Sequence, residues 1–116
     1  MHSDYKIPAN EMRHIRAMTD KIVAALNPLA VYLFGSFARG DYNEDSDYDF
    51  YVIMPSTEQR NLIELIVLAQ MAIVDILNRD VDIIVQKGDF FEKYKDNKVS
   101  LEFDVATDGI RLYGLG

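Results

Sequence analysis

A short stretch of the chain, residues 47–54, carries two aspartates and then a run of apolar and aromatic residues. Its sequence, Asp-Tyr-Asp-Phe-Tyr-Val-Ile-Met, is rich in β-forming side chains and predicts a largely buried strand. Side chains alternate between the two faces of a strand, so Asp47 and Asp49 should point the same way. Two adjacent carboxylates are costly unless a cation joins them. The segment therefore predicts a strand whose acidic end binds a cation.

Helices and further strands are predicted on either side of this segment. Apolar residues spaced by three and four predict a helix over 9–26, which Asn27 and Pro28 end. Ser56 and Gln59 have capping-box spacing and predict a helix from about 57 to 77. The other expected elements are strands over 29–34, 81–85 and 110–113, and helix over 90–106 in one or two pieces. Strands that alternate with helices indicate an α/β or α+β fold with a small mixed β-sheet flanked by helices.

The size and composition of the chain limit its classes of function. Its 116 residues fit a single domain over 1–116, too few for a catalytic domain plus a full substrate-binding domain. There is no cysteine, which excludes disulfides and thiolate metal sites and favours a reducing cytoplasm. The N-terminus lacks the apolar core of a signal peptide, and charges interrupt the apolar run 62–77, so no membrane span is expected. A net charge of −7 disfavours tight nucleic-acid binding and suits either a basic protein partner or simple solubility.

A third acid lies in another predicted strand. Asp82 follows Val81 and precedes three apolar residues, a setting in which an unpaired carboxylate would be expensive. If strand 81–85 lies beside strand 47–54, the three acids could share two metal ions. Carboxylate oxygens select Mg²⁺ or Mn²⁺, which commonly complete their shell with substrate phosphates.

The segment before the acid pair suits a phosphate ligand. Gly35 ends a predicted strand, and glycine lets the backbone come close to a ligand. Ser36 is predicted to cap a helical turn over 36–39, whose free N–H groups suit phosphate oxygens. Arg39, one turn further on, could donate to the same phosphates or pair with Asp41.

Residues 35–49, Gly-Ser-Phe-Ala-Arg-Gly-Asp-Tyr-Asn-Glu-Asp-Ser-Asp-Tyr-Asp, resemble the signature of the DNA polymerase β-like nucleotidyltransferase superfamily. That signature is Gly-Ser, ten residues, then Asp-x-Asp. The pattern Gly-Ser-x-x-Arg-Gly followed by Ser-Asp-x-Asp is similar to that of the minimal nucleotidyltransferase (MNT) branch. Residues 81–85 resemble its third-acid strand, and 103–113 resemble its usual end. The resemblance covers roughly 20–113 and implies a polymerase β-like nucleotidyltransferase fold.

The resemblance also implies a role for each site residue. The nucleotide-binding residues would be Gly35, Ser36, Arg39 and Ser46, and the catalytic and metal-binding residues would be Asp47, Asp49 and Asp82. The cofactors would be two Mg²⁺ ions, with Mn²⁺ as a substitute, and the substrate a nucleoside triphosphate, expected to be ATP. An acceptor hydroxyl would attack the α-phosphorus in line and release pyrophosphate, and Asp82 would help to deprotonate that hydroxyl. For Ser46, the alternative is that it organises the loop before Asp47.

Free-standing members of the MNT branch are commonly paired with HEPN-domain RNase toxins and act as antitoxins, in some cases by adenylylating a tyrosine of the toxin. The resemblance therefore implies transfer of AMP from ATP to a partner tyrosine. One alternative is a small-molecule nucleotidyltransferase of the aminoglycoside type, although such relatives usually carry a substrate domain. Another is a non-catalytic antitoxin that neutralises its partner by binding, against which the three intact acids argue.

The helix predicted over 57–77 is apolar around more than one face. The stripe expected to face the core consists of Leu62, Leu65, Ile66, Ala69, Ile73, Ile76 and Leu77. A second stripe consists of Ile63, Val67, Met71 and Val74. Such a helix should be buried on more than one side. The second stripe would meet another chain, either a HEPN-type partner or a second copy, or neighbours from the same chain.

Overall fold

The computed structural model of the protein describes residues 7–114, so part of the N-terminal segment considered for a signal peptide lies outside the described residues. The elements, in chain order, are α1 (Ala9–Leu26), β1 (Ala30–Phe34), α2 (Gly35–Arg39), β2 (Tyr48–Met54), α3 (Leu62–Ile73), the 3₁₀ turn η2 (Val74–Ile76), β3 (Val81–Lys87), α4 (Gly88–Tyr94), α5 (Leu101–Asp108) and β4 (Ile110–Gly114). No helix among these residues is both long and apolar enough to cross a bilayer.

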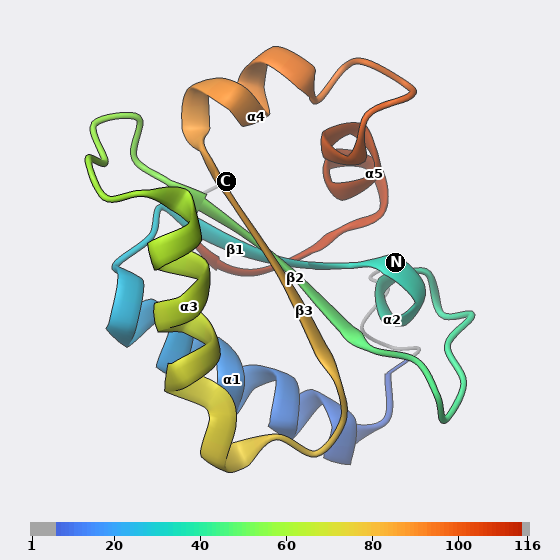
Figure 1. The fold of residues 1–116 in the computed structure, drawn as a ribbon. Helices are drawn as coiled ribbons and strands as arrows, with labels where there is room; N and C mark the ends of the chain where they lie inside the picture. Colours follow the sequence, from blue (N-terminus) through green and yellow to red (C-terminus); the bar gives the residue numbers. More distant parts are fainter. Residues whose placement is uncertain (1–6, 115–116) are drawn as a thin grey trace.

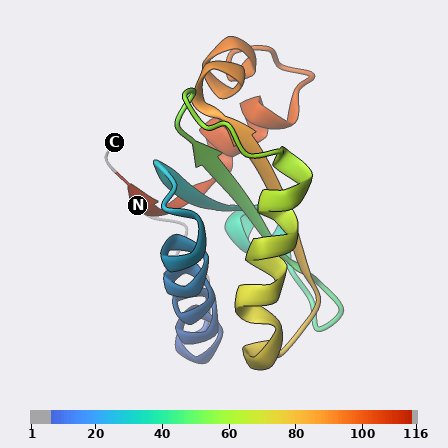
Figure 2. The same ribbon diagram turned by 60° about the vertical axis from the view of Figure 1, so that its left-hand side comes forward.

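The four strands form one mixed sheet in the order β3-β2-β1-β4. Strands β2 and β3 are parallel, because α3 returns the chain between them, and the β1–β2 and β1–β4 pairs are antiparallel. Helices α1 and α3 cover one face of the sheet, and α4 and α5 cover the other (Figures 1 and 2). The predicted mixed sheet flanked by helices is confirmed.

Alternation along β2 divides its side chains between two cores. Tyr48, Phe50 and Val52 are buried in the core beneath α1 and α3. Tyr51 and Ile53 are buried in the smaller core beneath α4 and α5. By the same alternation, Asp49 lies on the α4/α5 face, beyond the end of the smaller core. The strand therefore carries apolar residues on both faces along most of its length and an acid at the start of one face.

Several predicted boundaries differ from the structure, among them the starts of α3 and β1. Helix α3 begins at Leu62 rather than near 57, because Asn61 caps it: the Asn61 side chain accepts a hydrogen bond of 2.7 Å from the N–H of Ile63. The hydroxyl of Ser56, predicted to cap the helix, instead accepts a 3.1 Å bond from the N–H of Asp89. Strand β1 begins at Ala30, which leaves Leu29 exposed.

The two apolar stripes of α3 have different environments. The inner stripe packs into the core through Leu65, Ala69 and Ile73. The outer stripe is exposed, and the exposed fractions of its members are 71% for Ile63, 45% for Val67, 66% for Met71 and 64% for Val74. Leu77, predicted to face the core, is 47% exposed beside them. The described part of the chain therefore leaves this outer face uncovered.

Candidate functional site

The start of α2 lies against the carboxylate of Asp49. Phe34, the last residue of β1, pairs with Asp49 in the sheet, so Gly35 follows directly beside that acid. Gly35 has a φ of 74°, and a Cβ added to it would lie 2.2 Å from Oδ2 of Asp49. The backbone at Gly35 therefore comes close to a side chain of the same chain, and its approach to a ligand stays a prediction. Both the left-handed φ and the contact require glycine here.

Ser36 lies inside α2 rather than at its cap. The helix begins at Gly35, and extended Phe34 occupies the cap position. The prediction that Ser36 caps the turn was wrong, because the left-handed φ of Gly35 lets the chain turn from strand to helix one residue earlier. The carbonyl of Ser36 accepts bonds from the N–H groups of Gly40 (2.8 Å) and Asp41 (3.2 Å), which close the turn.

The three aspartates lie at adjoining positions of the sheet. Asp49 on β2 and Asp82 on β3 are direct register partners in the parallel pair. Adjacent strands are about 4.8 Å apart, so register partners on one face lie side by side. Asp47 stands immediately before the first residue of β2. The expectation that strand 81–85 lies beside strand 47–54 is confirmed.

The electrostatics of the acids are unequal. Burial, then the charges of Asp82 and Asp47, raise the pKa of Asp49 to about 6, while the charge of Arg39 opposes them. Asp49 is half-buried, whereas Asp47 and Asp82 are exposed. The sequence-based argument that burial makes Asp82 costly was therefore wrong, because its strand is near the edge of the sheet and its side chain reaches solvent.

This donor set fits a divalent cation. The donors are hard carboxylate oxygens. Burial is the main cause of the raised pKa of Asp49, and the negative charges of Asp82 and Asp47, which a cation would neutralise, add to it. Within residues 7–114, no three Asp, Glu, His or Cys side chains are gathered closely enough to enclose an ion by themselves. Mg²⁺ is commonly held by one or two carboxylates, with the remaining ligands supplied by water and substrate phosphates. The three aspartates are therefore not gathered into a complete ion site by themselves. A metal held by one or two of them, such as the register partners Asp49 and Asp82, would need phosphate oxygens and water as its other ligands.

Arg39 and Ser46 have local partners in the loop that joins α2 to β2. Nε of Arg39 donates to Oδ2 of exposed Asp41 at 3.3 Å, the pairing expected as the alternative to phosphate binding. The positive charge of Arg39 nevertheless lowers the pKa of Asp49, against the larger effect of burial. The hydroxyl of Ser46 accepts a 2.8 Å bond from the N–H of Asn43, so it organises the loop, as its alternative role predicted.

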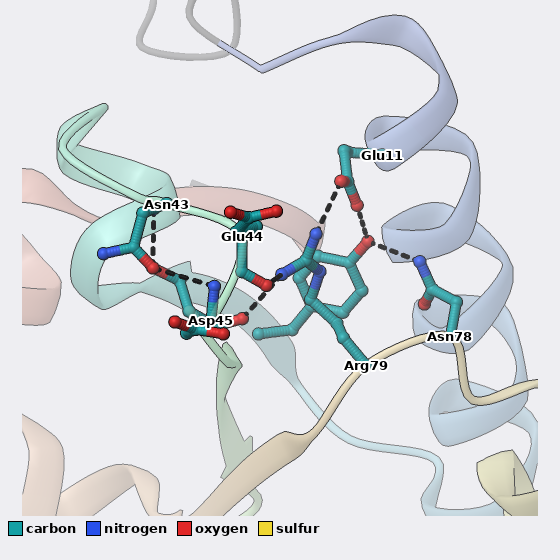
Figure 3. Close-up of polar contacts among 8 residues, drawn as sticks. Glu11, Asn43, Glu44, Asp45, Asn78 and Arg79 are labelled. Atoms are coloured by element: carbon teal, nitrogen blue, oxygen red, sulfur yellow. Dashed lines mark hydrogen bonds and ion pairs between the residues drawn. The ribbon is translucent and has the colours of Figure 1, made fainter.

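A cluster around Arg79 was missed in the sequence (Figure 3). Arg79 donates to Oε2 of Glu11 at 2.7 Å and to the carbonyls of Glu44 (3.1 Å) and Ser46 (2.9 Å). The hydroxyl of Tyr48 donates to Glu11 and accepts a 3.0 Å bond from Asn78. Arg79 and Glu11 are 68 positions apart, so no local pattern could have paired them.

Replacing Gly35 by alanine is expected to disrupt the site. The new Cβ would occupy the position of the Asp49 carboxylate and would force a non-glycine residue into a left-handed φ, which costs roughly 1–3 kcal/mol. Gly88→Ala is the matched control, because a Cβ there would meet nothing nearer than 3.7 Å. We expect Gly35→Ala to lower the melting temperature and weaken binding of an ATP analogue, measured by calorimetry. Equal behaviour of the two variants would show that the close approach is unimportant.

Comparison with known proteins agrees with this geometry. Residues 16–110 match the family model of the nucleotidyltransferase domain. No curated protein sequence matches the chain significantly. Among solved structures, one titled as a toxin–antitoxin with AMP-PNP is 24% identical, with a TM-score of 0.58 over 86% of this chain and 73% of the other. The MntA-HepT toxin–antitoxin is 22% identical, with a TM-score of 0.51 over 86% and 70%. A putative nucleotidyltransferase from Sulfolobus solfataricus is 20% identical, with a TM-score of 0.55 over 88% and 78%.

At these identities the solved structures establish the likeness of fold, and the family match covers most of the chain. Strands β1, β2 and β3, the glycine at the start of α2 and the paired aspartates of β2 and β3 all lie within the matched residues. The chain belongs to the nucleotidyltransferase domain family.

Proposed function

We propose that this nucleotidyltransferase moves AMP from ATP to a hydroxyl group, with Asp47, Asp49 and Asp82 as ligands of two Mg²⁺ ions. The observation that carries the proposal is the register pairing of Asp49 with Asp82 directly beside Gly35. Metal-binding carboxylates and a close backbone approach then share one end of the sheet. Mn²⁺ offers the same charge and similar ligand preferences and should replace Mg²⁺.

In the proposed reaction, the acceptor oxygen forms a bond to the α-phosphorus. The bond from that phosphorus to the bridging oxygen breaks, and pyrophosphate leaves with the electron pair. Asp82 is exposed at the start of β3 and accepts the proton of the attacking hydroxyl. Gly35 and Ser36 bind the triphosphate, and Arg39 and Ser46 contribute from the loop side. The metal ions, when bound, stabilise charge on the attacking and leaving oxygens.

We propose a tyrosine of a HEPN-type RNase toxin as the acceptor, with this chain as its antitoxin. Two similar structures are titled toxin–antitoxin, and one of them contains AMP-PNP. The exposed outer stripe of α3 offers a second contact for such a partner. Glu64 and Asp75 are exposed on the same helical segment, and residues 61–78 contain no Lys or Arg. A second copy of this chain docked on the same face would place like-charged acids opposite each other, which is unfavourable. A partner with an apolar surface flanked by basic residues would match both the apolar stripe and the acids.

A transfer assay tests the proposed function. The purified chain, Mg²⁺ and α-labelled ATP are incubated with the protein encoded by the neighbouring gene, and label on a tyrosine is located by mass spectrometry. We expect transfer by the wild type and none by Asp47→Asn. Label on an added aminoglycoside instead would identify a small-molecule enzyme. If Asp47→Asn still binds and neutralises the partner fully, binding alone accounts for antitoxin activity.

A further inference from the structure

Arg79 connects the parts of the candidate site that lie on different elements. It stands in the turn before β3, outside the motifs that mark the site in the sequence. Its guanidinium lies 5.1 Å from the ring centre of Phe37 on α2 and 5.4 Å from that of Tyr48 on β2. Phe37 immediately follows Ser36, and Tyr48 stands between Asp47 and Asp49. One side chain therefore contacts the neighbours of both the phosphate-binding turn and the acid pair.

The same guanidinium holds the loop before Asp47. The loop is closed by its own bonds: Asn43 accepts from the N–H of Asp45 through Oδ1 (2.8 Å) and from that of Ser46 through its carbonyl (3.1 Å). Arg79 then attaches this closed loop to the body of the protein through the carbonyls of Glu44 and Ser46. Asp47 follows directly in the sequence, so the loop fixes where β2 begins.

Glu11 fixes Arg79 in turn. The two side chains are only 17% and 15% exposed, and the carboxylate of Glu11 also accepts a bond from Tyr48. Nε of Arg79 is buried and meets no acceptor among the described residues. A buried ion pair is a poor source of stability, because desolvation offsets the attraction, and an unmade bond adds to the cost. The arrangement is better explained by the geometry that it imposes than by the stability that it adds.

We propose that Arg79 is a positioning residue that holds the loop 43–46, and through it Asp47, in register with α2. Glu11 and Tyr48 orient its guanidinium. The expected effect of Arg79 on metal affinity rests on the proposed function. Residues that orient metal ligands typically affect metal affinity by 10–100-fold when replaced. Lysine would keep the charge of Arg79 but not the planar fork that reaches two carbonyls and a carboxylate together.

The test compares Arg79→Met and Arg79→Lys with Ile22→Ala in the full chain. Ile22 is fully buried on α1 and has no place in this cluster, so its variant controls for lost stability. The first measurement is amide hydrogen exchange at Asp45, Ser46 and Tyr48 without ligand. We expect at least roughly tenfold faster exchange at these amides in Arg79→Met, a smaller increase in Arg79→Lys, and no selective increase in Ile22→Ala. If Arg79→Met does not fold, Arg79→Lys decides the comparison.

The second measurement is Mn²⁺ affinity, from the electron paramagnetic resonance signal of free Mn²⁺ with a non-hydrolysable ATP analogue. We expect Arg79→Met to weaken Mn²⁺ binding about 10–100-fold, well beyond Ile22→Ala. Unchanged exchange in the loop, or Mn²⁺ affinity equal to that of Ile22→Ala, would overturn the positioning role. Failure of the wild type itself to bind Mn²⁺ with the analogue would instead refute the proposed function, and the exchange data would still decide whether Arg79 holds the loop.

Discussion

Asp49→Asn is expected to lower nucleotide transfer by roughly 10²–10³-fold or more while the fold remains intact. Among the three aspartates, Asp49 is the one that pairs with Asp82 across the sheet and also touches the start of α2. The change is isosteric, so it removes the negative charge without opening space. Metal ions contribute several kcal/mol to stabilising transition-state charge, and each ~1.4 kcal/mol corresponds to a factor of ten in rate.

The matched control is Asp20→Asn, which removes the same charge from an exposed position on α1. Single-turnover measurement of transfer from saturating ATP separates the chemical step from binding. We expect Asp20→Asn to behave like the wild type and Asp49→Asn to lose the chemical step. A loss confined to KM would mean that Asp49 binds ATP without taking part in catalysis. A rate within threefold of wild type would refute its proposed metal-binding role.

Much of the candidate site could be predicted because its signals are local. The two-residue period of a strand predicts Asp47 and Asp49 on one face, although in the structure Asp47 lies just before the first residue of β2. The break at Gly35 is also local, since only the residue itself determines whether a left-handed φ is tolerable. The same holds for the end of α1, where Asn27 adopts a left-handed φ of 52°.

The remaining features depend on contacts between distant segments. The register of Asp49 with Asp82 depends on how α3 packs before the chain returns as β3, and the strand alone does not encode it. The start of α3 depends on competition between caps. Ser56 had the required spacing, but the segment before Asn61 instead folds back, with Arg60 donating to Glu58 at 2.9 Å and to the carbonyl of Leu26 at 3.2 Å.

The exposure of Asp82 was not predictable for a related reason. Its apolar neighbours in the sequence indicated burial, and Ile83 and Val85 are indeed in the core. The Asp82 side chain itself is exposed because β3 is the edge strand of the sheet. Exposure favours the proposed chemistry, because a proton acceptor must be reachable by the acceptor hydroxyl of a macromolecule.

The stability of the metal-free protein is expected to fall as the pH rises from about 4 to 7. The pKa of Asp49 is about 6 in the fold, raised by burial and then by Asp82 and Asp47, against an ordinary value of 3.8. Between these values the folded state binds more protons than the unfolded state, so stability decreases with pH. The pKa difference corresponds to about 3 kcal/mol, and partial solvent exposure reduces this to about 1–2 kcal/mol.

Glu11 acts in the opposite sense and at lower pH. Burial raises its pKa, but the hydrogen bonds from Tyr48 and Arg79, with the charge of Arg79, outweigh this and leave the pKa below its ordinary value of 4.5. Its contribution to stability is therefore present above about pH 4.5 and is lost below it. The two effects together predict a stability maximum between about pH 4 and 4.5, below the neutral range in which the site would work.

Thermal unfolding from pH 4 to 8, with EDTA or with saturating Mg²⁺ and an ATP analogue, measures this effect. We expect the melting temperature with EDTA to drop by about 4–8 °C between pH 4 and 7.5, at roughly 4 °C per kcal/mol. Asp49→Asn should remove most of that drop and be more stable than the wild type at pH 7.5. Mg²⁺ with the analogue should restore the wild type, because binding to the folded state neutralises the same carboxylates. A wild type and an Asp49→Asn variant with parallel pH profiles would show that neither burial nor the charges of Asp82 and Asp47 raise the pKa of Asp49 in the fold, and the strongest electrostatic argument for a metal between these acids would be lost.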